Sequence, residues 1–426
     1  MSNIIETIAA AAAQGVTGTT PTDLSEEFVA EHVEIYRYLH AHPELSSSEV
    51  ETAATITRRL EELGLEPFAC GGTGVVAVLR NGDGPVIAFR ADTDGLPILE
   101  QTGLEYASTA TGILPSGDVA PVMHGCGHDT HVTAALGAAQ LLLERRDAWS
   151  GTVVFVFQPA EETAAGARAM LADGLWERAP KPSVVLAQHV GPMPENLTAL
   201  SAGPMAMLAD SWRITVHGRG SHGSMPETSI DPIVAASAMV LRLQTIVARE
   251  LSPRTPAVVT VGTFHAGLKE NIIPASAEFT VNVRTPDEQT RDQVLSAIRR
   301  IVSAEAVASN APEPTIEEIN SFPRLYNDPA MTARVAAALE AEFGVGMVLD
   351  EKLGMGSEDA GLLGDAIDVP VVFWGFGSLP LTEFATGELP AANHSPFFRP
   401  NDRSAVVTGT RAAMAGILCF VGNPAD

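Results

Sequence analysis

The sequence predicts an α/β fold that carries a second, α+β module inserted into it. Short continuous apolar runs alternate with helical stretches in the first half of the chain and again near its end, which is typical of a largely parallel sheet covered by helices. Between these two parts the elements follow the order β-α-β-β-α-β, which is the order of a ferredoxin-like module. A chain of 426 residues is long enough for two such domains.

Apolar patterns predict the individual elements of the α/β part. Four runs are predicted to be buried strands, namely 85–89 (PVIAF), 152–157 (TVVFVF), 183–188 (SVVLAQ) and 369–376 (VPVVFWGF). Helical spacing predicts one helix that begins after Asp23 and two more over 132–148 and 163–174. Residues 1–23 show little pattern and are predicted to be a loose N-terminal tail.

The middle of the chain is predicted to form a domain of its own. Its four strands and two helices are expected, in chain order, over 211–218, 231–250, 257–267, 276–285, 288–306 and 314–320. We therefore assign residues 24–208 and 321–426 to one domain and residues 209–320 to the inserted domain.

The composition limits the classes of partner. Acidic residues number 52 against 26 basic ones, and a net charge of -26 repels nucleic acid and anionic membranes. No run reaches the ~20 apolar residues of a membrane span, and the N-terminal segment lacks the basic start of a signal peptide. Three cysteines form a sparse, odd set that suits a reducing compartment. We predict a cytoplasmic protein that binds neither nucleic acid nor membrane.

Residue types that bind metals are densest in residues 123–131, MHGCGHDTH, called the Cys-x-His loop below. Cys126 and His128 stand two apart among glycines, which permit tight backbone turns. Thiolate and imidazole are preferred ligands of zinc and related ions. A lone Cys-x-His pair is more often a buried thiol beside helix-capping residues, so a metal site needs further ligands.

Further candidate ligands stand where predicted strands end. They are Glu161 and Glu162 after 152–157, His189 at the end of 183–188, and His394 after 369–376. Adjacent glutamates are usually a solvated helix start, but here they follow a buried strand and the turn at Pro159. In open α/β sheets, ligands bind outside the carboxyl ends of the strands. We therefore expect these side chains to meet the Cys-x-His loop at one metal centre.

Other polar residues in these segments are interpreted as structural. His40 and His42 precede Pro43 at a helix end and resemble a ligand pair only superficially. Capping and packing are expected to account for His124, Asp129 and His131.

Eight ordered motifs carry a family resemblance, namely HAHPELSSSE (40–49), FRADTDGLP (89–97), MHGCGHDTH (123–131), FQPAEE (157–162), GRGSHGSMP (218–226), ENIIP (270–274), GSEDAG (356–361) and NHSPFF (393–398). Through them the chain resembles the dinuclear-metal amidohydrolases that include hippurate hydrolase, auxin-conjugate (IAA-amino acid) hydrolases and bacterial N-acyl-amino-acid aminoacylases. The resemblance runs from about residue 30 to residue 410. It implies a zinc-aminopeptidase-like catalytic domain with an inserted ferredoxin-like lid and dimerisation domain.

The resemblance also implies roles for the candidate residues. Two divalent ions per subunit, with zinc favoured over Mn, Co or Ni, would be held by Cys126, His128, Glu162, His189 and His394. Glu161 would act as the general base that activates a water and passes its proton to the departing amine. Asp92 would orient a ligand or the Cys-x-His loop, although a turn-forming aspartate is an equally good interpretation. Which ligand bridges the two metals stays open.

In the inserted domain the resemblance implies three more site residues. His222 would reach the active site of the partner subunit and donate to the developing oxyanion. Asn271 and Arg284 would contact substrate, with Arg284 gripping a free carboxylate through two hydrogen bonds. Without the resemblance, His222 would be a turn histidine and Arg284 a surface arginine. A lid that pairs subunits implies a homodimer or a homotetramer.

The implied activity is hydrolysis of N-acyl amino acids to a carboxylic acid and an amino acid. A dipeptidase or carboxypeptidase with the same metal chemistry is the alternative, and the Cys-x-His loop, in place of an aspartate-bearing one, favours the first. A non-catalytic metal-binding relative should have lost the proton shuttle, yet Glu161 is present together with all five ligands. Ala360 stands where the family commonly has an aromatic residue, so the acyl preference does not transfer from any one relative.

Overall fold

The computed structural model of the protein describes residues 22–350, 354, 356–384 and 389–422. The chain divides into two compact units. The first comprises Met1–Met205, Tyr326–Lys352 and Asp359–Asp426, and the second comprises Ala206–Leu325 and Leu353–Glu358. The second unit is wider than the range 209–320 assigned from the sequence, and it also takes in a short segment from later in the chain. Nearly all of the predicted tail, residues 1–21, lies outside the described residues.

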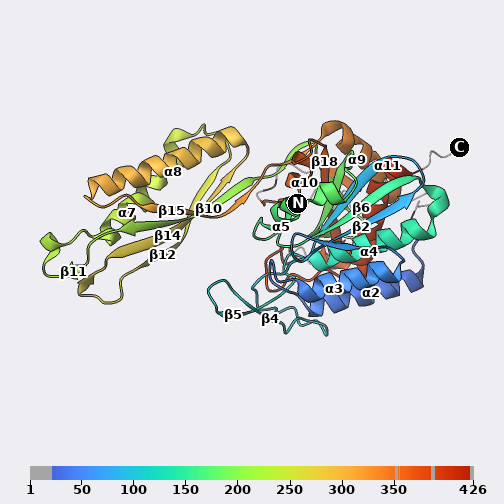
Figure 1. The fold of residues 1–426 in the computed structure, drawn as a ribbon, viewed down its shortest axis with the longest axis horizontal. Coiled ribbons are helices and arrows are strands. Elements are labelled where there is room, and N and C mark those ends of the chain that lie inside the picture. The colour runs from blue at the N-terminus through green and yellow to red at the C-terminus, as the bar shows by residue number, and fades with distance from the viewer. Residues whose placement is uncertain (1–21, 351–353, 355, 385–388, 423–426) are drawn as a thin grey trace. The chain divides into compact units, whose positions relative to one another are not determined.

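A largely parallel sheet forms the centre of the first unit, which confirms the predicted α/β fold (Figure 1). The strand order is β1 (Phe68–Cys70), β2 (Gly74–Asn81), β6 (Gly151–Gln158), β3 (Val86–Asp92), β7 (Val185–Pro194), β18 (Val371–Leu379), β16 (Leu325–Asn327) and β9 (Gly203–Ala206). Two short strands, β8 (Thr198–Leu200) and β17 (Val348–Asp350), pair beside β18. Strand β3 pairs in parallel with β6 and β7, and β18 pairs in parallel with β7 and β16. The antiparallel strands β1 and β2 at one edge were not predicted.

The register of the parallel strands brings three chain segments to the same level. Asp92, the last residue of β3, pairs with Gln158, the last residue of β6. On the other side of β3, Arg90 pairs with Ala187, so that Asp92 stands level with His189 two residues further along β7. Since all three strands run in the same direction, the loops that follow β3 and β6 leave from one edge of the sheet, beside His189.

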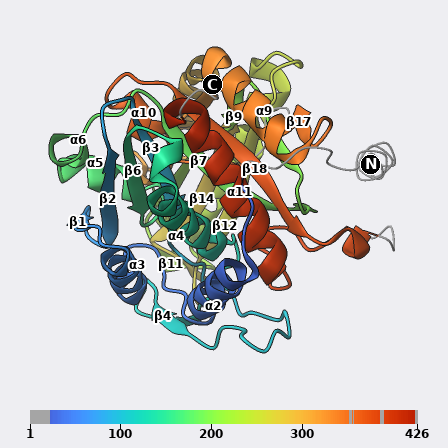
Figure 2. The same ribbon diagram turned by 90° about the vertical axis from the view of Figure 1, so that its right-hand side faces the viewer.

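Helices of the first unit pack against this sheet and against one another. The main ones are α2 (Glu26–Ala41), α3 (Val50–Glu62), α4 (His128–Glu144), α9 (Pro329–Phe343) and α11 (Asp402–Val421). Helix α11 contacts α4, α9, α2 and strand β18, while α4 also contacts β3 and β7 (Figure 2). Because both α4 and α11 are covered by neighbours, nearly every residue of α4 is buried.

Two helices in the described part of the chain are long and apolar enough to cross a membrane by length and composition, Pro232–Glu250 and Asp402–Val421. The expectation that no segment reaches this length is therefore wrong. Helix α11 is 72% buried in its most apolar window, as expected of the core helix of a layered fold. The segment Pro232–Glu250 is only 33% buried by the same measure.

The second unit is a four-stranded antiparallel sheet with two helices. Its strand order is β12 (Val258–Ala266), β14 (Ser276–Thr285), β10 (Leu208–His217) and β15 (Thr315–Phe322), and its helices are α7 (Pro232–Leu243) and α8 (Glu288–Ala308). Along the chain these elements follow the β-α-β-β-α-β order. Every second residue of β14 from Ala277 to Thr285 is buried, because one face of the strand packs on the helices.

Candidate metal centre

Five side chains meet at the carboxyl edge of the sheet in the first unit. Cys126 Sγ lies 3.4 Å from His189 Nε2 and 3.2 Å from His394 Nε2. His394 Nε2 lies 3.3 Å from Glu162 Oε1, and His128 Nε2 lies 3.9 Å from the same oxygen. The structure therefore brings together all five residues that the sequence analysis names as metal ligands. Their donor atoms are one thiol, three imidazole nitrogens and one carboxylate.

A left-handed glycine shapes the Cys-x-His loop. Gly127 has a φ of 84°, and a Cβ atom at this residue would lie 2.4 Å from Val190 Cγ1. Only glycine fits both the backbone conformation and the close approach. Helix α4 begins at the next residue, so that His128 projects from its first turn while Cys126 projects from the loop before it.

Backbone hydrogen bonds tie the loop of the last ligand to the Cys-x-His loop. His394 has a φ of 69°, and its N–H donates to Gly125 O at 2.7 Å. The preceding side chain, Asn393, donates through Nδ2 to Cys126 O at 3.0 Å and to Val190 O at 3.2 Å. Segments more than 200 residues apart in the chain are thus held in register at the site.

Hydrogen bonds at Nδ1 leave Nε2 of two histidines available to a cation. His128 Nδ1 donates to Asp94 Oδ1 at 3.1 Å, and His189 Nδ1 donates to Val190 O at 2.8 Å. Within the described residues, the buried atoms His128 Nε2 and Glu162 Oε1 have no hydrogen-bond partner. Buried polar atoms without a hydrogen bond are costly, and a metal ion would satisfy both. The donor set and its geometry therefore fit a divalent metal.

The electrostatics of the cluster favour an ionised thiol. Although burial opposes ionisation, the charges of His189 and His128 hold the pKa of Cys126 well below its usual range. Burial opposes the charge on His189 too, but the thiolate raises the pKa of His189 to about 9. The close contacts with Cys126 and with the carboxylate of Glu162 raise the pKa of His394 to about 10. Protons held here would give way to a bound metal ion.

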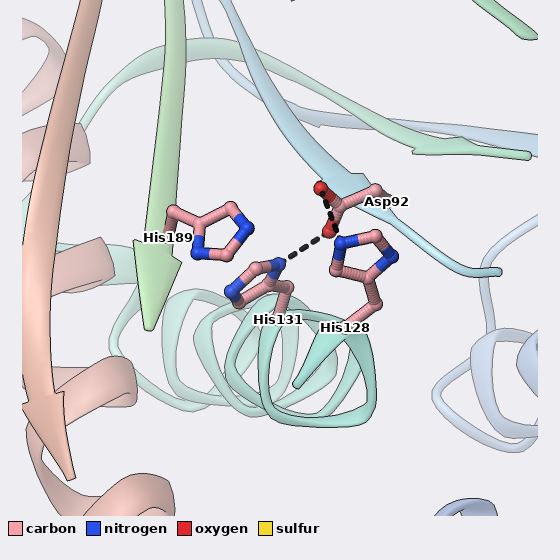
Figure 3. A group of neighbouring side chains, drawn as sticks. All are labelled: Asp92, His128, His131 and His189. Atoms are coloured by element: carbon pink, nitrogen blue, oxygen red, sulfur yellow. Dashed lines mark hydrogen bonds and ion pairs between the residues drawn. The ribbon is translucent and has the colours of Figure 1, made fainter. Parts of the chain in front are cut away.

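Asp92 lies beside the cluster and is hydrogen-bonded to His131 (Figure 3). Its carboxylate accepts hydrogen bonds from His131 Nδ1 and, at 2.8 Å, from Arg90 Nη1. The N–H of Val190 donates to His131 Nε2 at 2.8 Å, so both ring nitrogens of His131 are occupied. Burial lowers the pKa of His131 to about 3, which keeps the ring neutral. We conclude that His131 is structural, although it lies among possible ligand atoms.

Glu161 lies next to the cluster, in a turn. Glu161 is 5% exposed, and one oxygen of its carboxylate lies within 4.8 Å of possible ligand atoms of His128 and Glu162. Helix α5 (Gly166–Ala172) begins only four residues after Glu162. The alternative that the paired glutamates are a solvated helix start is therefore wrong.

The three candidate residues of the second unit do not lie together. His222 in β11 (Ser221–His222) pairs with Ile272 in β13 (Ile272–Ile273), and the N–H of Gly223 donates to Asn271 O at 2.8 Å. Arg284 lies at the other end of β14 from these residues. At about 3.3 Å per residue, the strand from Ser276 to Arg284 spans about 26 Å. His222 and Asn271 thus adjoin, while Arg284 stands apart.

Comparison with known proteins adds an independent observation. A family model described as Peptidase family M20/M25/M40 matches residues 88–414. The chain belongs to this family. Membership confirms the resemblance that the eight motifs carry, and with it the prediction of a metal-binding enzyme that hydrolyses amide bonds.

Relatives in this family act on several kinds of amide. N-acetylcysteine deacetylase of Bacillus subtilis (strain 168) is 41% identical over 65% of this chain and 70% of its own length. Thermostable carboxypeptidase 1 of Saccharolobus solfataricus is 34% identical over 77% of this chain and 81% of its own length. Hippurate hydrolase of Campylobacter jejuni is 36% identical over 80% of this chain and 85% of its own length. One solved structure is of a Bacillus subtilis protein described as a dinuclear metal binding peptidase from the M20 family. It is 31% identical, covers 92% of this chain and 99% of its own, and has a TM-score of 0.72.

Asp94 had no role predicted from the sequence, although its carboxylate contacts two of the candidate ligand residues. Its carboxylate accepts from His128 Nδ1 and, at 3.1 Å, from the N–H of Glu162. Its position two residues after Asp92, just beyond the predicted strand 85–89, was the available signal.

Asp94→Ala is expected to lower metal affinity about 10- to 100-fold, because two ligands lose their orientation. Titration against a metal-buffering chelator measures this change, and Asp83→Ala, in an exposed turn, is the control.

His40 gives a pH-dependent stability. His40 Nδ1 lies 2.6 Å from Asp129 Oδ2, and Nε2 lies 3.2 Å from Glu100 Oε1, with all three side chains fully buried. Although burial opposes the charge, these two carboxylates raise the pKa of His40 from 6.5 to about 9. A pKa raised on folding contributes stability that is complete below about pH 6.5 and is lost as pH rises through about 9.

We therefore expect wild type to have a larger free energy of unfolding than His40→Gln at pH 6. This difference between wild type and variant should be up to about 3 kcal/mol larger at pH 6 than at pH 9.5. Urea unfolding at both pH values gives the difference. His42→Gln, at an exposed residue, should follow the wild-type pH dependence. An equal gap between wild type and His40→Gln at the two pH values would contradict the charged state of His40.

Proposed function

We propose that the protein hydrolyses the amide bond of N-acyl amino acids and uses two divalent ions per subunit. The observation that carries this proposal is the position of Glu161 beside the five clustered ligand side chains. A carboxylate that is close to the metal ligands but left outside their set can move protons. The reaction yields a carboxylic acid and an amino acid.

Glu161 and the ligands have different tasks. Bound divalent ions act as Lewis acids toward the amide carbonyl and lower the pKa of water at the site. Glu161 removes the proton from the attacking water and then delivers it to the departing amine nitrogen. Glu162, one residue further on, stays with the cluster through its contact with His394.

The ligand chemistry bears on which metal is bound. A thiolate ligand, Cys126, favours zinc over harder ions, while the imidazoles and the carboxylate also accept Mn, Co or Ni. The five protein ligands would be divided between the two ions. The 31% identical relative described as binding a dinuclear metal supports this stoichiometry.

The substrate class rests on the relatives together with the Cys-x-His loop. The deacetylase and hippurate hydrolase relatives are named for N-acyl amino acids, whereas the carboxypeptidase relative is named for peptides. A dipeptidase or carboxypeptidase activity is thus the second candidate. Ala360 is fully buried and stands where an aromatic residue is common, so the acyl preference has to be measured.

We further propose that the second unit pairs two subunits. Strand β12 lies at the edge of its sheet, so one side of its backbone has no neighbouring strand among the described residues. Val258 and Phe264 of this strand are 37% and 39% exposed. On helix α7, which contacts β12, Val234 and Leu241 are 64% and 74% exposed. An apolar edge of this kind is stabilised by pairing with a second chain.

Pairing would also place His222 at the active site of the partner subunit. The N–H and hydroxyl of Ser224 both donate to His222 Nδ1, at 3.1 and 2.7 Å. The ring proton therefore resides on Nε2, which is free to donate to a developing oxyanion. Arg284 lies about 26 Å along β14 from Ser276, and His222 lies beyond the Ser276 end of that strand, so the two residues of one subunit would act on substrate in different active sites.

The free cysteines support a reducing location. Cys70, Cys126 and Cys419 are all unpaired in the structure, which agrees with the proposed cytoplasmic setting.

Glu161→Gln tests the proposed reaction. We expect wild type to cleave N-acetyl-, N-benzoyl- or longer N-acyl amino acids once metal is restored after chelation. Glu161→Gln should retain its metal content but lose about 100-fold or more in kcat, since general base catalysis contributes at least that much. Glu177→Gln, at an exposed glutamate, is the control. Cleavage of dipeptides alone would replace the substrate class, and an active Glu161→Gln would refute the assignment of the base.

Subunit complementation tests the role of His222. Glu161→Ala and His222→Ala should each be inactive alone, because each homodimer lacks one required group in both sites. After mixing and subunit exchange, a hybrid dimer has one site with both groups, and about a quarter of wild-type activity is expected for random pairing in a twofold dimer. If His222 served its own subunit, the mixture would stay inactive. A fully active monomer in light scattering would also contradict the proposal.

A further inference from the structure

The turn that carries Glu161 adopts an unusual backbone. Residues 159–166, called the base loop here, contain two non-glycine residues with positive φ, Ala160 at 49° and Ala164 at 55°. L-residues rarely adopt this conformation. The loop closes on itself, because the N–H groups of Ala165 and Gly166 both donate to Ala160 O at 3.1 Å. The conformation of Ala160 therefore sets the direction in which Glu161 leaves the end of strand β6.

One buried carboxylate holds Ala160 in this conformation. Glu49 is fully buried at the start of helix α3, and its Oε1 accepts the N–H of Ala160 at 2.8 Å. The same oxygen accepts the N–H of Ser47 at 2.9 Å, and Ser47 has a φ of 65°. Glu49 Oε2 accepts from the hydroxyl of Thr73 at 2.6 Å. A single oxygen atom thus binds the backbone N–H of two left-handed residues, one of which directly precedes Glu161.

The residue after Glu161 is held from the same segment. The N–H of Glu162 donates to Asp94 Oδ2 at 3.1 Å, and the hydroxyl of Ser46 donates to that oxygen at 2.7 Å. The segment 46–49 therefore reaches the backbone N–H of both residues that flank Glu161, that of Ala160 directly and that of Glu162 through Asp94. None of these contacts involves the five clustered ligand side chains.

We propose that Glu49 is a positioning residue for the general base. By accepting the N–H of Ala160 it holds the base loop in its left-handed turn, so that the carboxylate of Glu161 stays beside His128 and Glu162. This inference rests on the proposed role of Glu161. A general base must lie within hydrogen-bond reach of the proton it removes, and small displacements at such a site are costly in rate.

The chain offers matched variants. Glu49→Gln retains an oxygen for the two N–H groups and an amide that can donate to Thr73, so its kcat should stay within about threefold of wild type. Glu49→Ala removes every one of these contacts and should lower kcat about 10- to 100-fold, with little change in KM or metal content. Glu44 is the control, because its carboxylate accepts from Thr52 N–H at 2.8 Å at the start of the same helix. Glu44→Ala should destabilise α3 without a comparable loss of kcat.

The measurement is kcat, KM and metal content for all variants at a temperature where each is folded, with wild type and Glu161→Gln in the same assay. An unchanged kcat in Glu49→Ala would overturn the proposal, as would an equal loss in Glu44→Ala or in Glu49→Gln. If Glu49→Ala does not fold, Glu49→Asp replaces it, because the shorter side chain retains the charge but draws the acceptor away from Ala160. Its kcat should fall as expected for Glu49→Ala, and a wild-type value would overturn the proposal.

A crystal structure of Glu49→Ala, or of Glu49→Asp in its place, separates this inference from the proposed function. The inference predicts that Ala160 leaves the left-handed region and that the Glu161 carboxylate moves away from His128. An unchanged base loop would overturn the inference even if wild type proved inactive on every substrate. Inactive wild type together with a displaced loop would instead overturn the proposed function and leave the positioning role supported.

Discussion

The candidate site depends on the register of three parallel strands. Because Asp92 and Gln158 pair at the ends of β3 and β6, and His189 stands level with them on β7, the loops that carry the other groups start from a common edge. A slip of one residue in this register would turn every side chain of a strand to the opposite face. The apolar sheet core, with Phe89, Phe155 and Leu186 fully buried, makes such a slip unfavourable. Packing in the core therefore determines the geometry of the site.

A buried ion network reinforces this register from within the sheet. Arg90 is fully buried, and it donates to Asp92 at 2.8 Å, to Gln158 at 2.9 Å and to Asp359 at 3.1 Å. Burying such charges costs free energy that is recovered only when each is well paired. The pairing fixes the carboxylate of Asp92, which in turn fixes the neutral ring of His131. The cluster of ligand side chains thus rests on polar groups that are hydrogen-bonded, while two of its own atoms, His128 Nε2 and Glu162 Oε1, have no hydrogen bond among the described residues.

Much of this arrangement could be predicted from the sequence, because it follows from local patterns. The four predicted strands and the ordered motifs identify the sheet, its carboxyl edge and the cluster of ligand side chains. Helices α3, α9 and α11 were missed, and α11 shows why, since its apolar residues run around the whole helix and give no one-sided stripe. Contacts such as Glu49 with Ala160 join residues more than 100 positions apart. Neither the spacing nor the residue types of the two segments indicate such a contact.

The second unit imposes a different constraint. Arg284 pairs with Ala209, close to where the chain enters this unit, whereas His222 and Asn271 lie beyond the opposite end of the same strands. A stiff antiparallel sheet cannot bring both ends to one substrate molecule, because its strands neither shorten nor fold back. If both ends contact substrate, each sheet must serve two active sites, and each active site needs two chains. Dimerisation would then be a condition for completing the oxyanion-binding group, so that activity and subunit association should weaken together on dilution.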